Sequence, residues 1–191
     1  MKKNNFLIFA IIISAFSATK IFPQTNIRFE GIGGKIGFII PENPIDNTFS
    51  ISAHADLGTI FDRVFVGAIA EYWSKSYNAS SIANTFFDGK WTEFIIAPTF
   101  KFKFYTPTKF ITYAGGGIGF AIVSSNTDFK DGSQVVRSSE SKLNAALFFL
   151  GGVEYPFNKN LKGISEIKFH INGANFFGIY AGLTYLLPLN N

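Results

Sequence analysis

The sequence has no cysteine, only two histidines and few charged residues for a chain of 191 residues. Without cysteine, the chain has neither a disulfide framework nor a thiolate metal site. Charged residues make up 16% of the chain, against roughly 25% in an ordinary soluble domain. This shortage argues against a soluble α/β enzyme. A chain without disulfides needs another means of holding its fold, and a closed, hydrogen-bonded barrel would supply it.

A basic surface of the kind that binds nucleic acid is also missing, although the pI is near 9.2. Lys2, Lys3 and Lys20 lie in the first 20 residues, so the rest of the chain has 14 basic residues against 13 acidic ones. The high pI therefore comes largely from the N-terminal segment, and we expect no nucleic-acid partner.

The N-terminus carries a short, strongly apolar run. Two lysines precede the run Phe6–Ile13, and small residues such as Ala15 and Ser17 follow it. This is the order of a secretory signal peptide, and the run is shorter than the roughly 20 residues of a spanning helix. We therefore predict a signal peptide over residues 1–24, cleaved between residues 17 and 25, rather than a membrane anchor. Residues 25–191 would form one exported domain.

Phenylalanine is abundant, with 24 residues, and much of it falls in alternating segments. The stretch WTEFIIAPTFKFKF, Trp91–Phe104, alternates strictly, which predicts a strand with two different environments. Its apolar face holds Phe94, Ile96, Pro98, Phe100, Phe102 and Phe104, and its polar face holds Glu93, Thr99, Lys101 and Lys103. Pro98 cannot donate to a β-ladder and counts against a perfectly regular strand, although a β-bulge could accommodate it.

Eight segments have this kind of pattern, and most are longer than the roughly 5 to 6 residues usual in soluble strands. A tilted membrane-spanning strand needs about 9 to 11 residues. The connections alternate between long, polar loops and short turns, as in outer-membrane barrels. The long loops are Pro41–Thr48, Ser76–Gly89 and Ser124–Lys142. The strands are Asn26–Ile40, Phe49–Ile60, Val64–Lys75, Trp91–Phe104, Phe110–Val123, Leu143–Tyr155, Gly163–Ile171 and Phe176–Leu187.

The sequence therefore predicts an all-β fold, an eight-stranded antiparallel up-and-down transmembrane β-barrel. In lipid every backbone polar group must pair internally, so the strands must close. The Phe-rich faces would contact acyl chains, and the polar faces would line the lumen. Aromatic residues near the strand ends predict two girdles. One would hold Trp73, Tyr77 and Trp91, and the other Phe61, Tyr105, Phe110, Tyr155 and Phe157. The alternative is a soluble β-barrel with its apolar faces turned inwards around a small apolar ligand.

Three motifs carry a resemblance to a known family. These are FIIAPTFKFKF, then KFITYAGGGIGFAI after a turn, and LFFLGGVEYPF with its Gly-x-Glu-Tyr strand. Together they resemble the outer-membrane protein β-barrel domain family of Gram-negative bacteria, especially its Bacteroidetes-type members, over essentially the whole mature chain. The resemblance implies a small barrel in the cell outer membrane. The chain end also resembles a signal for the barrel-assembly machinery, carried by Tyr180, Gly182, Tyr185 and Leu187.

The predicted lumen carries charges of both signs. An eight-stranded barrel is just wide enough for side chains to fill, so we predict an internal polar network rather than an open pore. A narrow porin-like channel is the alternative. The network would comprise Glu71, Glu93, Lys101, Lys103, Glu154, Glu166, Lys168 and His170.

No segment carries a motif for catalysis, a cofactor or a metal. His170, in EIKFHINGAN, faintly resembles the His-x-Ser-Asn segment of outer-membrane lipid A deacylases. Asn172 stands where the nucleophilic serine would be, which weakens the alternative of a lipid-modifying enzyme. A metal site of His54, Asp56 and His170 lacks ligand spacing. The glycine-rich stretches do not stand at a strand-to-helix junction, as a nucleotide loop would.

The sequence thus favours a non-enzymatic outer-membrane protein with a structural or surface-interaction role. Its partners would be outer-membrane lipid and the barrel-assembly machinery. An extracellular partner could bind through the loops at 76–89 and 124–142, because loops carry much of the binding function of proteins.

Overall fold

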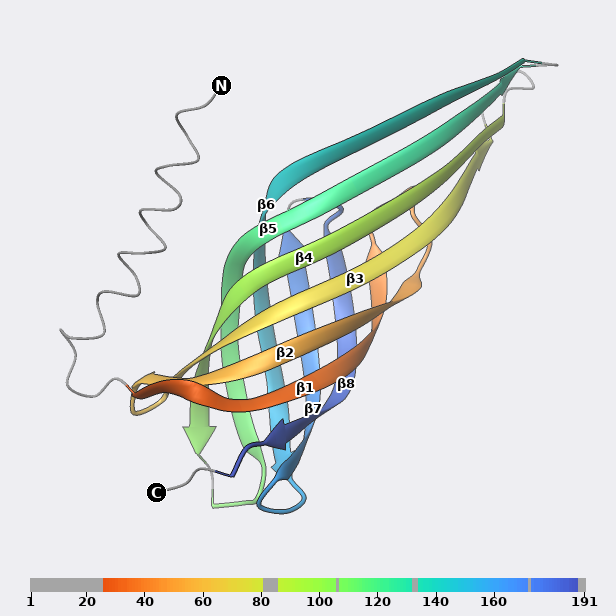
Figure 1. Ribbon diagram of the computed structural model, residues 1–191. Helices are drawn as coiled ribbons and strands as arrows, with labels where there is room; N and C mark the ends of the chain where they lie inside the picture. The colour runs from red at the N-terminus through yellow and green to blue at the C-terminus, as the bar shows by residue number, and fades with distance from the viewer. Residues whose placement is uncertain (1–25, 81–85, 106, 132–133, 172, 189–191) are drawn as a thin grey trace, which may run out of the picture.

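The computed structural model describes residues 26–80, 86–105, 107–131, 134–171 and 173–188. The predicted signal peptide, residues 1–24, lies outside these ranges. Each strand pairs antiparallel with its neighbours in the chain, and β8 pairs with β1, so the sheet closes into a barrel (Figure 1). The strands are β1 (Asn26–Pro41), β2 (Thr48–Phe61), β3 (Val64–Ser80), β4 (Phe86–Tyr105), β5 (Ile111–Asp131), β6 (Gln134–Pro156), β7 (Leu161–Ile171) and β8 (Phe176–Leu186). The predicted fold class is confirmed.

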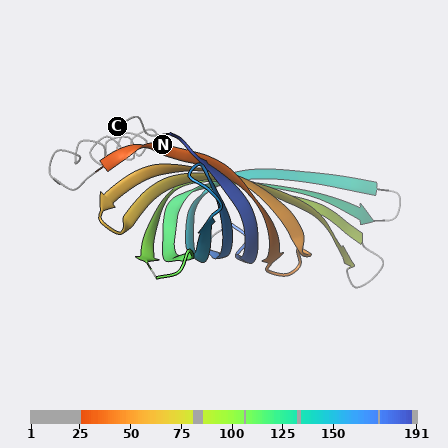
Figure 2. The same ribbon diagram turned by 90° about the horizontal axis from the view of Figure 1, so that it is seen from below.

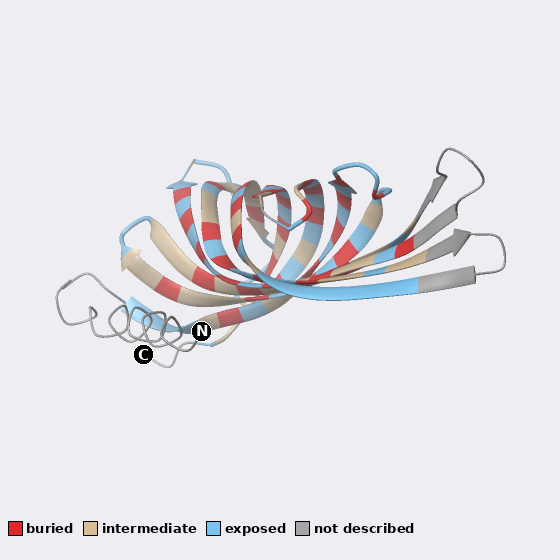
Figure 3. Cartoon of the chain, turned by 90° about the horizontal axis from the view of Figure 1, so that it is seen from above, coloured by how far each residue is buried: buried red, intermediate tan, exposed pale blue. Residues whose placement is uncertain are grey.

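The barrel has its apolar side chains outside and its charged side chains inside. Within the barrel, buried and exposed residues alternate along the strands (Figure 3). On β4, Phe100 and Phe102 are 46% and 41% exposed, whereas the intervening Lys101 is only 8% exposed. A broad apolar outer surface of this kind is suited to hydrocarbon and not to water. The fold is that of a transmembrane β-barrel, and the arrangement of a soluble barrel with inward apolar faces is not observed. Among the described residues, no helix is both long and apolar enough to cross a membrane.

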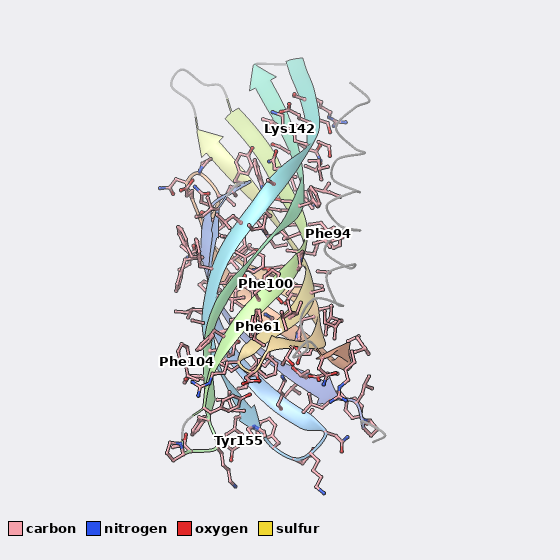
Figure 4. The ribbon with its side chains drawn as sticks, turned by 90° about the vertical axis from the view of Figure 1, so that its left-hand side faces the viewer. Phe61, Phe94, Phe100, Phe104, Lys142 and Tyr155 are labelled. Atoms are coloured by element: carbon pink, nitrogen blue, oxygen red, sulfur yellow. The ribbon has the colours of Figure 1, made fainter. Side chains whose placement is uncertain are left out.

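The two ends of the barrel differ. The end with the short connections β2–β3, β4–β5 and β6–β7, called the turn end here, also has the start of β1 and the end of β8. Its aromatic girdle is present, with Phe61 44%, Phe110 52% and Phe157 57% exposed. Tyr155 contacts the rings of Phe110 and Phe157 with centroids 5.1 and 5.4 Å away. In Figure 4, Phe104 and Tyr155 lie toward this end and Lys142 lies at the other, called the loop end.

The girdle predicted at the loop end is wrong. Trp73 is only 1% exposed and packs inside the barrel, where its ring centroid is 5.9 Å from that of Phe176. Tyr77 and Trp91 pack against the same internal cluster. The reason is the period of the strand. Trp73 follows Glu71 by two residues and Trp91 precedes Glu93 by two, so each tryptophan shares the inward face of its glutamate.

Two of the predicted loops are largely strand. β3 and β4 stay paired as far as Ser80↔Phe86, and β5 and β6 as far as Asp131↔Gln134. These four strands therefore continue past the barrel as a sheet, called the extension here, which projects to one side (Figures 1 and 2). The eight residues of β5 from 124 to 131 span roughly 26 Å. Their polar composition suggested loops, but a β-ladder is made by the backbone and needs no apolar side chains once water bathes both faces.

Pro98 is accommodated without a β-bulge. β4 runs past Pro98 without any register shift towards β3 or β5. Pairing with β5 stops at Ile96↔Phe120 and resumes at Thr99↔Gly117 in the same register. The missing N–H of proline is thus accommodated by a short gap in the ladder, beside the glycine-rich part of β5.

Candidate functional site

The lumen is the place where functional groups gather. All eight residues predicted for the polar network lie inside the barrel, and none is more than 8% exposed. Inward alternation alone accounts for this, because residues two apart on a strand share a face. The residues fall into three ionic clusters along the barrel and one histidine–carboxylate pair at the loop end.

The first cluster lies nearest the turn end. Lys103 donates to Glu154 over 2.8 Å, and Lys162 contacts Glu154 at 3.2 Å. Lys162 also donates to Asp56 over 2.7 Å. Two lysines and two carboxylates from four strands therefore form a neutral chain of ion pairs. The side chains of His54 and Thr184 lie in the neighbouring part of the lumen, where His54 Nε2 and Thr184 Oγ1 form a hydrogen bond 2.8 Å long.

The second cluster is centred on Glu166. Its Oε1 accepts a hydrogen bond from Lys35 over 2.5 Å, and its Oε2 accepts one from the Tyr113 hydroxyl over 2.8 Å. Lys101 approaches the same carboxylate at 4.0 Å and lies 4.7 Å above the Tyr113 ring. Four strands thus meet at one carboxylate whose side chain is only 1% exposed.

The third cluster pairs Lys168 with Glu71. The Tyr180 hydroxyl donates to the other oxygen of Glu71 over 2.7 Å. Aromatic rings surround the lysine, with the Tyr180 centroid 4.7 Å and the Phe176 centroid 5.2 Å from its Nζ. This cation is therefore held by one carboxylate and the faces of neighbouring rings.

Glu93 and His170 stand apart from these clusters. Both are fully buried, with Nε2 of His170 3.9 Å from Oε1 of Glu93. They lie in the apolar cluster that fills the loop end of the lumen, where His170 stacks on Phe176 at 4.7 Å between centroids. Within the described residues, Glu93 is the one lumen carboxylate without a lysine in contact.

Sequence reasoning named only part of this network. It omitted Lys35, Lys162, Tyr113 and Tyr180, and it considered Asp56 only as a metal ligand. Lys162 is an even number of residues from Glu166 and Lys168 on β7, so it shares their inward face. The predicted strand began at Gly163, and a strand predicted from Leu161 would have placed Lys162 inside. Lys35 lies in the glycine-rich stretch of β1, where few large side chains reveal the alternation.

The lumen holds equal numbers of lysines and carboxylates. Five lysines and five carboxylates point into it in the described residues, and nine of these ten groups form ion pairs with one another. Mutual pairing of this kind limits the cost of burying charge, and side chains fill the interior of an eight-stranded barrel. The site can stabilise and seal the lumen. The described residues contain no group of three or more His, Cys, Asp or Glu side chains arranged to hold a metal.

The residues of the predicted assembly signal lie on β8 and just beyond it. Tyr180 points inward and its hydroxyl donates a hydrogen bond to Glu71, whereas Tyr185 is 49% exposed on the outer surface. Leu187 follows the end of the strand, and its backbone N–H donates to the backbone carbonyl oxygen of Glu30 over 2.9 Å. The role of these residues in barrel assembly stays a prediction.

The chain matches no family model and no curated protein. Its structure is similar to solved membrane barrels. Neisserial surface protein A aligns with a TM-score of 0.57 at 13% identity, covering 85% of this chain and 100% of that one. A major outer membrane protein from Thermus thermophilus aligns with a TM-score of 0.52 at 8% identity, covering 83% and 99%. At these identities the likeness shows a shared fold, the small outer-membrane barrel.

Proposed function

We propose that this chain is a non-enzymatic protein of the bacterial outer membrane with a closed lumen and a surface-interaction or structural role. The extension carries the proposal, because a four-stranded sheet outside the lipid-facing band adds nothing to closing the barrel. The apolar outer surface and the similarity to small outer-membrane barrels support the location. Membership of the Bacteroidetes-type branch stays part of the proposal.

A sealed lumen supports the choice over a porin-like channel. Three ionic clusters occupy the barrel, and apolar residues from the walls and two connections fill its loop end. An ion crossing the lumen would have to separate buried ion pairs, which costs several kcal/mol for each pair. A planar bilayer containing the refolded protein should therefore show no conductance steps above those of the bare bilayer.

The extension offers a polar surface for a partner. On β6, pairing with β7 begins only at Leu147↔Ile171, so the described residues 137–146 form one margin of the extension. Arg137 and Lys142 carry side chains 82% and 61% exposed. The polar surface begins where the lipid-facing residues end. Leu143 is 67% exposed, and Ser141, two residues before it on the same face of β6, is an exposed polar residue. An extracellular partner at the sites expected in residues 76–89 and 124–142 would therefore meet the described parts of these segments, residues 76–80, 86–89, 124–131 and 134–142, as a sheet with an unpaired backbone edge and charged side chains.

The placement of His170 supports a non-enzymatic reading over a lipid-modifying enzyme. His170 is 0% exposed, and its Nδ1 lies 3.4 Å from the Ala174 carbonyl oxygen. A histidine turned into the barrel does not reach lipid on the outer surface. Asn172, the residue at the serine position, lies outside the described residues.

The first test is a heat-shift gel on the chain from Thr25 onward, refolded in detergent micelles. A folded membrane barrel should resist SDS when unheated and migrate differently after boiling. Refolding without detergent should abolish the shift. A soluble, monomeric product in plain buffer would refute the membrane assignment.

The second test addresses the extension. Residues 126–139 can be replaced by Asn-Gly, a two-residue hairpin turn, because Ser125 and Glu140 are register partners. The shortened chain should keep its heat shift and lose adhesion of displaying cells to immobilised extracellular proteins. Equal adhesion by both chains would exclude the β5–β6 hairpin as the binding surface.

A further inference from the structure

The loop end of the lumen is closed by two connections that hold each other. The Asn175 side chain donates to Glu42 over 2.8 Å, and the Glu42 backbone N–H donates to the Asn175 carbonyl over 2.9 Å. Ile45 from the β1–β2 connection and Ala174 from the β7–β8 connection are both buried in the apolar cluster below. The closure therefore depends on this cluster staying free of uncompensated charge.

Glu93 lies inside this cluster and accepts no hydrogen bond from the described residues at either oxygen. The Trp91 indole and the Ala174 backbone amide are directed at the carboxylate without reaching hydrogen-bond geometry. His170 Nε2 lies 3.9 Å from Glu93 Oε1 and likewise has no hydrogen-bond partner in the part of the chain that the structure describes. Its Nδ1 faces the Ala174 carbonyl, so the pair also touches the connection that caps the barrel.

Few other charges face this pair. Lys168 on β7 and Glu71 on β3 act on both Glu93 and His170, but they are ion-paired with each other. Tyr180 on β8 is bonded to Glu71. No described residue supplies a separate counter-charge, so the ionic state of Glu93 and His170 depends mainly on the protons that they hold between them.

We propose that Glu93 and His170 form a single-proton latch on the loop end of the barrel. With one proton between them the pair is neutral overall, whether the proton is on the carboxyl or on the imidazole. A second proton leaves an imidazolium without a counterion, and loss of the only proton leaves a bare carboxylate. Either charge is unfavourable in an apolar cluster, so the Ala174 connection loosens on both sides of a middle pH range.

The chain offers a local probe of this region. It has two tryptophans, and both lie at the latch: Trp73 is the cross-strand partner of Glu93, and Trp91 packs against the same cluster. Acrylamide quenching of tryptophan fluorescence in the refolded full chain therefore reports on the loop end and not on the clusters below. We would measure it from about pH 4 to pH 9, a range that spans the ordinary titration of Glu and His.

The wild-type chain should show a minimum of quenching at intermediate pH, with a rise on the acidic and on the alkaline side. Glu93→Gln should lose the alkaline rise, because no proton remains to be released. His170→Gln should lose the acidic rise. The matched control is His54→Gln, which changes the other histidine and should keep both. A heat-shift gel at neutral pH establishes that each variant is folded.

A flat wild-type profile would overturn the latch. The latch would also be overturned if the acidic and the alkaline rise in quenching both persisted in Glu93→Gln and in His170→Gln. Residues with a purely packing role would change quenching equally at every pH. Loss of only the alkaline rise in Glu93→Gln and of only the acidic rise in His170→Gln supports the latch. The outcome does not depend on the surface-interaction role, which the shortened extension tests separately.

Discussion

Replacing Glu166 with glutamine should cause the largest loss of stability among single changes of similar size in the lumen. The substitution keeps the shape of the side chain and removes the charge that Lys35 and Lys101 approach at 2.5 and 4.0 Å. The two lysine side chains are only 4% and 10% exposed, so water does not replace the lost partner. Breaking a buried ion pair by removing one member costs about 3–5 kcal/mol, and we expect a loss in that range.

The assay is urea unfolding of the protein in lipid vesicles, followed by tryptophan fluorescence, with midpoints compared at a common m-value. The matched control is Glu140→Gln, whose ion pair with Lys142 is 61% exposed on both sides. A surface pair of this kind contributes about 0–1 kcal/mol. The reasoning is refuted if the two variants unfold at the same midpoint. A double change, Glu166→Gln with Lys35→Met, should recover part of the loss, because it removes one of the two unpaired charges.

Two further predictions concern the wall of the barrel. Gly119→Ala places a Cβ 2.2 Å from the Ile96 carbonyl oxygen and should lower the free energy of unfolding by about 1–3 kcal/mol. Its control, Gly151→Ala, should be nearly neutral, because the nearest atom to the new Cβ is 3.7 Å away. Equal urea midpoints for the two variants would contradict the close approach of β4 and β5. Phe100→Arg puts a charge on the lipid-facing surface and should cost about 2–4 kcal/mol. The same change at Ser141, beyond the lipid-facing band, should leave the midpoint close to wild type, and an equal loss at both positions would place the lipid boundary elsewhere.

The sequence by itself was enough for the fold class and for which side chains face inward. Alternation is a local property with a period of two, so the faces of Trp91–Phe104 could be assigned without knowing any neighbouring strand. The same rule, applied to Trp73 and Trp91 relative to Glu71 and Glu93, would have placed both tryptophans inside. The error came from reading position along the strand as position on the outer surface.

Which inward residues meet was decided only by the closed barrel. Lys35 and Glu166 are 131 positions apart, and their contact depends on the register of several strand pairs and on the stagger with which the sheet closes. The closed barrel also decides that Glu93 is not in contact with a described lysine, because it places Glu93 at the loop end and the lumen lysines further along the barrel axis. Composition could not reveal that the polar segments of β3 to β6 continue as a sheet, because a ladder outside the membrane is held by backbone hydrogen bonds that leave no apolar pattern in the sequence.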